Sequence, residues 1–214
     1  MTMNYDQKYL TYTGWDIEFD TVIGRRGGHA LLTAVLLPST ILIARLITKK
    51  SQDCVCSQFD WLEQRLKANR QRQEGQDGAW WWFSSMLTDR GAEMGDFKRL
   101  ERTLFPEELP GNEPPVRGRV FYCNAYSSWQ KPHVEEAHTL LRRVLPKKSW
   151  FEHLTQKDID LICSHINSYS REALKGACPF DVAPAGFTGR LMHSLGLKRI
   201  DPDDVNLAKD LLCQ

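Results

Sequence analysis

The chain has 214 residues, of which 42% are hydrophobic and 26% are charged, so it is long enough for one large soluble domain with a core of its own. Its 28 Lys and Arg residues nearly balance its 27 Asp and Glu residues, which gives a net charge of +1. This balance excludes a strongly basic DNA-binding domain, whose phosphate contacts need clustered positive charge.

The first predicted element is a β-strand at residues 15–23, WDIEFDTVI. Its side chains alternate between apolar and polar and include Ile, Phe and Val, which favour strands. Because side chains alternate along a strand, Asp16, Glu18 and Asp20 then share one face. A turn follows at residues 25–28, RRGG.

A long apolar stretch comes next, at residues 30–47. Its 18 residues are about the minimum for a membrane span. However, the sequence Pro-Ser-Thr interrupts the middle, and Arg45 is charged. Two strands at 30–37 and 40–47, joined by a tight turn, explain the stretch better. We therefore expect no membrane segment.

Helical spacing follows at residues 51–68, with Ser51 as a candidate N-cap. The apolar stripe of this helix consists of Val55, Phe59, Leu62 and Leu66. The polar segment 69–78 predicts a loop. Residues 79–87, AWWWFSSML, predict a fourth strand that leads to Asp89. We interpret its three tryptophans as part of a buried strand; the alternative is a platform on which nucleic-acid bases stack.

The last predicted strand is residues 120–125, VFYCNA, after an extended proline-rich connection at 105–118. The order of elements is then three strands, a helix, a strand, a short helix or loop, a strand and two helices. This is the ribonuclease-H-like arrangement. The expected fold class is therefore α/β, with a mixed five-stranded sheet flanked by helices.

Two helices are predicted after the last strand. Pro132 suits the first turn of one helix, because the N–H that proline lacks would be unpaired there anyway. Its apolar face consists of Val134, Ala137, Leu141, Val144 and Leu145. The other helix runs from Thr155 to Tyr169, with Thr155 as N-cap and Asp158 at the third position, as in a capping box.

The six cysteines are scattered and include no C-x-x-C pair, so we do not expect a structural zinc site. Without a secretory signal, reduced and buried thiols are the expected state.

Three carboxylates stand in positions that suit metal-dependent chemistry. Asp20 and Asp89 lie at the ends of predicted strands, and Glu135 lies in the first turn of a predicted helix. Carboxylates on such elements can converge on divalent cations, and paired cations cut and join phosphodiesters. Asp20 would bridge two cations, Asp89 would bind one of them and Glu135 the other.

Longer blocks of sequence resemble the catalytic core of insertion-sequence transposases of the IS-thirty group, which carry a D-D-E integrase core. The blocks are WDIEFDTVIGRRGGHALLT, LTDRGAE, VFYCNAYSSWQKPHVEEAH, LRRVLPK and LTQKDIDLICSHINSY. The resemblance implies that Asp20, Asp89 and Glu135 are the catalytic and metal-binding triad. It also implies Mg²⁺- or Mn²⁺-dependent hydrolysis at transposon ends and attack of the freed 3′-OH on target DNA. A homo-oligomer on DNA in the bacterial cytoplasm, associated with the nucleoid, is expected.

Basic side chains near the triad are candidates for contact with DNA. They are Lys131, His138, Arg142, Arg143 and Arg90. His138 lies three residues after Glu135 and thus on the same helix face. For Lys131, Arg142 and Arg143, ordinary solvated helix surface is the alternative. His138 could instead support the metal ligands from behind or be a surface or core histidine. Arg90 could instead compete with metal for the carboxylate of Asp89.

The predicted organisation is an N-terminal extension at 1–14, the catalytic core at 15–170 and a helical or irregular tail at 171–214. Similar transposases usually have an N-terminal helix-turn-helix region, so we expect the chain to be truncated or a separate core polypeptide. A catalytically silent remnant, acting as an inhibitor or assembly partner, is therefore one alternative. The other is a general ribonuclease-H-like nuclease.

Overall fold

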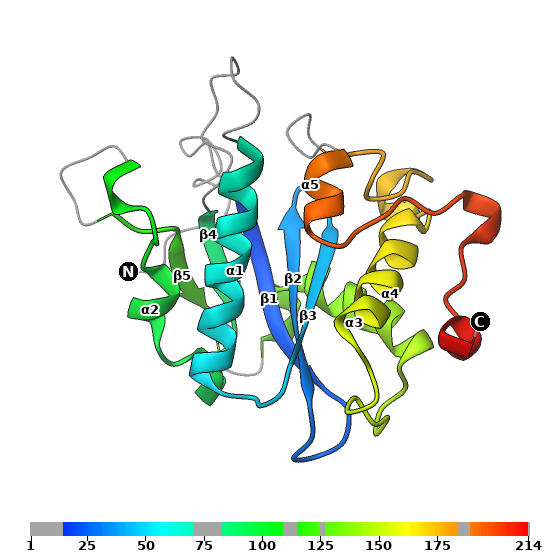
Figure 1. Cartoon of the computed structure of the whole chain (residues 1–214), viewed down its shortest axis with the longest axis horizontal. Coiled ribbons are helices and arrows are strands. Elements are labelled where there is room, and N and C mark those ends of the chain that lie inside the picture. The colour runs from blue at the N-terminus through cyan, green and yellow to red at the C-terminus, as the bar shows by residue number, and fades with distance from the viewer. Residues whose placement is uncertain (1–14, 71–82, 109–114, 125–126, 184–188, 214) are drawn as a thin grey trace.

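The computed structural model describes residues 15–70, 83–108, 115–124, 127–183 and 189–213. Its strands are β1 (Trp15–Ile23), β2 (Ala30–Leu37), β3 (Ile41–Ile47), β4 (Phe83–Thr88) and β5 (Arg119–Tyr122). They form one sheet in the order β3-β2-β1-β4-β5 (Figure 1). The β1–β2 and β2–β3 pairs are antiparallel, whereas β1–β4 and β4–β5 are parallel. The predicted mixed five-stranded sheet is therefore confirmed.

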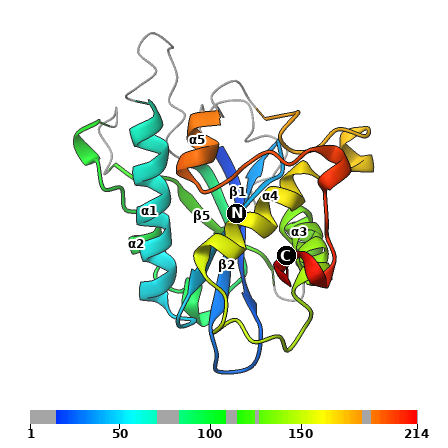
Figure 2. The same ribbon diagram turned by 45° about the vertical axis from the view of Figure 1, so that its right-hand side comes forward.

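The helices are α1 (Gln52–Arg70), α2 (Phe97–Glu101), α3 (Pro132–Val144), α4 (Gln156–Ser168) and α5 (Gly189–Ser194). Figure 2 shows α1 and α3 on opposite sides of the sheet. Phe19 of β1 packs edge-on against Phe59 of α1, with ring centroids 4.8 Å apart. Glu18 and Asp20, whose side chains point to the other face, meet α3 instead. The predicted alternation along β1 is thus confirmed and separates an apolar face from a carboxylate-bearing face.

The outer edge of β3 is covered by side chains of α4. The Asn167 side chain accepts from the Leu42 N–H and donates to the Leu42 carbonyl, both at 2.8 Å. Gln156 likewise accepts from the N–H of Leu46 and donates to the carbonyl of Ala44. These bonds satisfy backbone groups that an edge strand would otherwise present to another chain.

Local signals predicted the helix starts well. The Ser51 hydroxyl accepts the Cys54 N–H at the start of α1. Thr155 and Asp158 form the predicted capping box at the start of α4. The apolar face predicted for α3 is buried. These features depend on neighbours within one helical turn, which is why the sequence alone indicates them.

Other boundaries were wrong or lie outside the described residues. The last strand ends at Tyr122 rather than at residue 125, although the Cys123 N–H still donates to Thr88 of β4. Helix α1 continues to Arg70, two residues into the predicted loop. The predicted connection at 105–118 contains a helical turn, Pro106–Glu108. The tryptophan run precedes Phe83 and lies outside the described residues.

Residues after the predicted core pack against it. Leu191, Leu195 and Leu197 are buried in the same hydrophobic cluster as the sheet. The predicted domain limits stay a prediction. All six cysteines are free, but Cys54 is only half-buried and Cys213 is exposed, so the expectation of burial holds for the other four. Among the described residues, no helix is both long and apolar enough to cross a membrane.

Candidate metal and nucleic-acid site

The three candidate carboxylates meet around the side chain of Lys131, the residue just before α3. Its ammonium nitrogen Nζ contacts Asp20 Oδ2 and lies 3.4 Å from Asp89 Oδ2 and 3.9 Å from Glu135 Oε1. Asp20 comes from the middle of β1, Asp89 follows β4, and Glu135 belongs to the first turn of α3. Glu18 pairs with Leu87 in the parallel β1–β4 ladder, so Asp20 and Asp89, each two residues further along the chain, come level with each other.

The cluster faces solvent on one side. The Lys131 side chain is 3% exposed, whereas the side chains of Asp89 and Glu135 are 48% and 44% exposed. Burial opposes the charged form of Lys131, but the hydrogen bond that its ammonium donates to Asp20 and the charges of all three carboxylates outweigh it and raise the pKa of this lysine. Lys131 is therefore a firmly charged ammonium between the carboxylates.

The chemistry of this cluster fits a divalent cation. Hard cations prefer carboxylate oxygens, and here three carboxylates already surround one positively charged atom. Nevertheless, no group of three His, Cys, Asp or Glu side chains in the described part of the chain is arranged to hold a metal ion as it stands. The ammonium of Lys131 occupies the position between Asp20, Asp89 and Glu135.

Glu18 fixes the start of α3 against β1. This side chain is 1% exposed, and its Oε2 accepts the backbone N–H groups of His133 and Val134, both at 2.9 Å. Its Oε1 lies 2.8 Å from Nδ1 of His133, and this hydrogen bond raises the pKa of His133. A buried carboxylate at a helix N-terminus satisfies unpaired N–H groups and interacts favourably with the helix dipole. Glu18 thus places Glu135 beside Asp20.

His138 lies one helical turn after Glu135 and faces β2. Its Nε2 is 2.7 Å from the hydroxyl of Thr33, and that hydroxyl donates to the backbone carbonyl of Asp20 at 3.0 Å. Because the Thr33 proton is already donated, Nε2 of His138 is the donor. Burial lowers the pKa of His138 to about 4, so the ring is neutral at pH 7.

A second buried carboxylate, Glu93, supports the strand next to Asp20. It accepts the hydroxyl of Thr21 at 2.8 Å and pairs with Lys50 at 2.9 Å. Sequence reasoning missed Glu18, Thr33 and Glu93 as parts of the site. Only Glu18 carried a signal, because it shares a strand face with Asp20.

The remaining basic candidates are not gathered around the carboxylates. Arg142 donates to the backbone carbonyl of Ile23 at 2.8 Å, and burial lowers its pKa. Arg143 is exposed, with its guanidinium 5.8 Å from the ring centroid of Tyr169. Arg90 is exposed beside Asp89. The assignment of these three residues to DNA contact stays a prediction.

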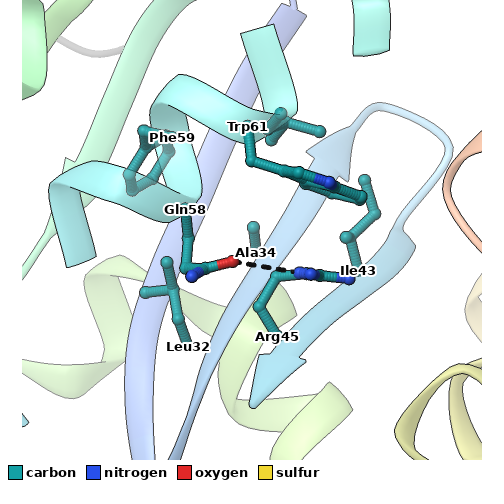
Figure 3. A pocket seen from close by; sticks show the side chains of 8 residues that line it. Leu32, Ala34, Ile43, Arg45, Gln58, Phe59 and Trp61 are labelled. Atoms are coloured by element: carbon teal, nitrogen blue, oxygen red, sulfur yellow. Dashed lines mark hydrogen bonds between the residues drawn. The ribbon is translucent and has the colours of Figure 1, made fainter. Parts of the chain in front are cut away.

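A small pocket lies on the other face of the sheet, between α1 and strands β2 and β3 (Figure 3). Arg45 crosses it, hydrogen-bonded to Gln58 at 3.0 Å and stacked 3.9 Å from the ring centroid of Trp61. Its lining residues Leu32 and Ala34 flank Thr33, whose side chain points to His138. The sheet therefore separates this pocket from the carboxylate cluster.

No profile of a known protein family matches the chain. Among curated proteins, it is similar to transposase InsI for insertion sequence element IS30A of Escherichia coli (strain K12). They are 31% identical over 102 residues, which are 48% of this chain and 24% of the relative. It is also similar to the putative integrase ORF3 of Spiroplasma virus SpV1-R8A2 B, with 27% identity over 173 residues, 77% of this chain and 44% of the relative. The matches thus span less than half the length of either relative, and the predicted resemblance to insertion-sequence transposases is confirmed.

The fold has a solved counterpart in the simian T-cell lymphotropic virus intasome in complex with PP2A regulatory subunit B56 gamma. The superposition covers 79% of this chain and 54% of that chain, with a TM-score of 0.53 and 13% sequence identity. At this identity the likeness concerns the fold alone. The predicted ribonuclease-H-like class is confirmed.

Proposed function

We propose that this chain contains the catalytic core of a DNA transposase, which hydrolyses phosphodiesters at transposon ends and joins the freed 3′-OH to target DNA. The observation that carries the proposal is the convergence of Asp20, Asp89 and Glu135, from three separate elements, on one cationic atom. The similarity to transposases and an integrase supports the same chemistry.

Asp20, Asp89 and Glu135 would together hold a pair of Mg²⁺ or Mn²⁺ ions. Bound there, such a cation pair would lower the pKa of the attacking water or 3′-OH and neutralise the leaving oxygen. Asp20 is held in place more firmly than the other two, because it is the least exposed of the three and accepts the N–H of Thr21 at 2.6 Å.

Lys131 has two roles in this proposal. Without metal, its ammonium offsets the mutual repulsion of three carboxylates. A divalent cation held by the same carboxylates would take the place of the ammonium, and the Lys131 side chain would then bind a phosphate of the DNA. This retains Lys131 as a DNA contact and gives it a resting position on the carboxylates.

Glu18 and His138 are positioning residues in this account. Glu18 holds the first turn of α3 and so sets the direction of Glu135. His138 acts through Thr33 on the backbone of Asp20 rather than on a phosphate. The proposed partner is DNA, bound by more than one copy of the chain, in the bacterial cytoplasm.

One observation favours a second hypothesis, in which the chain is a catalytically silent partner of a full-length transposase. The Lys131 ammonium already fills the position between the carboxylates. If it cannot be displaced, the chain would fold and assemble with relatives without binding metal.

A nicking and strand-transfer assay tests the proposal. The substrates are pre-cut duplexes taken from the repeats that flank the gene, with Mn²⁺, and the proteins are wild type and Asp89→Asn. Products that require Mn²⁺ and disappear in Asp89→Asn support a transposase core. If folded wild-type protein gives no product, the silent-partner reading is preferred; nicking that survives in Asp89→Asn removes that residue from the triad.

A further inference from the structure

Three loops come together at the end of the sheet beyond the carboxylate cluster. They are the β1–β2 turn at 24–29, the β3–α1 connection at 48–51 and the α3–α4 loop at 145–155. In the sheet register, Ala30 pairs with both Ile23 and Ile47, which places the first two loops side by side. Arg25 pairs with Glu152 at 3.1 Å and joins the third loop to them. All three lie along the lower edge in Figures 1 and 2.

These loops concentrate positive charge. They carry six of the chain's 28 Lys and Arg residues but only one of its 27 Asp and Glu residues. We call this cluster the basic edge; its members are Arg25, Arg26, Lys49, Lys50, Lys147 and Lys148. The rest of the chain is therefore net acidic, so the near-neutral total conceals a strong asymmetry.

Four members of the basic edge have no carboxylate partner in the described part of the chain. Arg25 pairs with Glu152, and Lys50 pairs with Glu93. The other four are exposed and form no ion pair with a described residue: Arg26, Lys49, Lys147 and Lys148. They are available to an external anion.

The basic edge is firmly attached to the elements that carry the carboxylates. The guanidinium of Arg25 lies 3.3 Å from the ring centroid of Trp150. Gly24 packs so closely against the α3–α4 loop that a Cβ there would lie 2.3 Å from the carbonyl oxygen of Ser149. Arg142 of α3 donates to the carbonyl of Ile23 at the end of β1. The positive charges thus have a fixed location relative to Asp20.

Asp20 is three residues before Ile23, so the basic edge begins about 10 Å from it at roughly 3.3 Å per strand residue. That distance is about three base-pair steps of duplex DNA, at roughly 3.4 Å each. We infer that the basic edge binds the phosphate backbone of double-stranded DNA that extends away from the carboxylates. This inference rests on the proposed function, because it takes DNA as the substrate of Asp20, Asp89 and Glu135.

Phosphate contacts made by the basic edge are expected to contribute to the salt dependence of DNA binding. Each neutralised phosphate changes the slope of log K against log salt by about 0.9. Replacing all four unpaired cations by Gln, as Arg26→Gln, Lys49→Gln, Lys147→Gln and Lys148→Gln, is therefore expected to flatten the slope by about 3.6. It should also weaken binding at about 50 mM salt by tenfold or more.

The probe is a fluorescent 30-base-pair duplex of arbitrary sequence, titrated in EDTA by anisotropy over about 50 to 200 mM salt. A matched control replaces one Arg and three Lys residues that are exposed in the C-terminal part of the chain: Lys175→Gln, Arg190→Gln, Lys198→Gln and Lys209→Gln. Both variants lose the same formal charge, so only the location differs.

The inference holds if the edge variant binds DNA more weakly and with a flatter salt dependence, while the control stays close to wild type in both. Equal losses in both variants, or no duplex binding by wild type, overturn it. Running the Mn²⁺ strand-transfer assay on the same preparations separates the two proposals. Edge-dependent binding without chemistry would leave the basic edge standing and count against the transposase. Strand transfer by wild type, together with an edge variant whose salt slope is unaltered, would support the transposase and overturn the role of the basic edge.

Discussion

The carboxylate of Glu18 in β1 accepts the backbone N–H of His133 in the first turn of α3 at 2.9 Å, across 115 positions of sequence. The same oxygen also accepts the N–H of Val134. Strand and helix are therefore joined at one buried group. The proposed ligand Asp20 lies two residues after Glu18 in β1, and the proposed ligand Glu135 lies two residues after His133 in α3. The geometry of the site depends on Glu18 although this residue contacts no candidate ligand side chain.

Glu18→Gln is expected to lower the free energy of unfolding by about 2 kcal/mol, because one carboxylate oxygen becomes an NH₂ donor directed at backbone N–H or His133. Urea unfolding followed by circular dichroism measures the change. The control is Glu172→Gln, an exposed glutamate that forms no ion pair with a described residue and is expected to change stability by less than about 0.5 kcal/mol. Equal stability of both variants would mean that Glu18 does not anchor α3.

Lys131→Met is expected to tighten Mn²⁺ binding by on the order of tenfold, because a cation no longer has to displace an ammonium from between three carboxylates. Isothermal titration calorimetry on wild type and variant measures the dissociation constant. The control is Lys175→Met, which removes an exposed lysine outside the cluster. Weaker Mn²⁺ binding by Lys131→Met would show instead that the ammonium organises the carboxylates for metal.

We predict that the buried ring of His138 makes the folded state less stable in acid. Burial lowers its pKa to about 4 in the folded state, whereas an unfolded histidine titrates near 6.5. Between these values the unfolded state binds more protons, so the folded state loses stability as the pH falls through this range. The expected contribution between pH 7 and pH 5 is about 2 kcal/mol.

His138→Gln, which can still donate to Thr33, should remove most of that contribution. Urea midpoints at pH 7 and pH 5 for wild type, His138→Gln and the exposed-site control His153→Gln check this. An identical acid loss in wild type and His138→Gln would place the titrating group elsewhere.

We predict that substituting Arg117, which is not part of the carboxylate cluster, lowers the free energy of unfolding strongly. Its side chain is 0% exposed, contacts Asp60, lies 3.6 Å from Glu63 and donates to the carbonyl of Arg102 at 2.6 Å. Arg117→Met is expected to destabilise the fold by about 3 kcal/mol, because Glu63 is left buried without its cation.

Adding Glu63→Gln to Arg117→Met should recover part of the loss, since the uncompensated charge is removed. The comparison in urea unfolding is Arg119→Met, at a position 48% exposed two residues away. Similar losses in the Arg117 and Arg119 variants would contradict a special role for the buried cation.

Local patterns predicted the elements whose stabilising groups are close in sequence. The alternation in β1, the proline at the start of α3 and the capping box of α4 are all read within a few residues. The end of the last strand was overestimated because apolar character continues to Cys123, which is buried beyond the end of the ladder. Propensity does not locate where a neighbouring strand stops.

The sequence indicated the three candidate carboxylates, whose role as metal ligands stays a prediction, but it did not indicate the contacts around them. The resemblance and the strand ends together pointed to Asp20, Asp89 and Glu135, which the fold brings around one atom. Lys131 was predicted to touch DNA, and nothing in its local sequence indicates that it lies among the carboxylates. Contacts such as Glu18 with His133, or His138 with Thr33, join residues more than 100 positions apart and need the folded chain.

The most direct test of the metal site compares Glu135→Gln with Glu136→Gln. The two carboxylates are neighbours on α3 with nearly equal exposure, 44% and 43%, but only Glu135 faces Lys131. Calorimetric titration with Mn²⁺ is expected to lose most of its binding heat in Glu135→Gln and to remain like wild type in Glu136→Gln. Equal Mn²⁺ binding in wild type and both variants would contradict a metal site built from Asp20, Asp89 and Glu135.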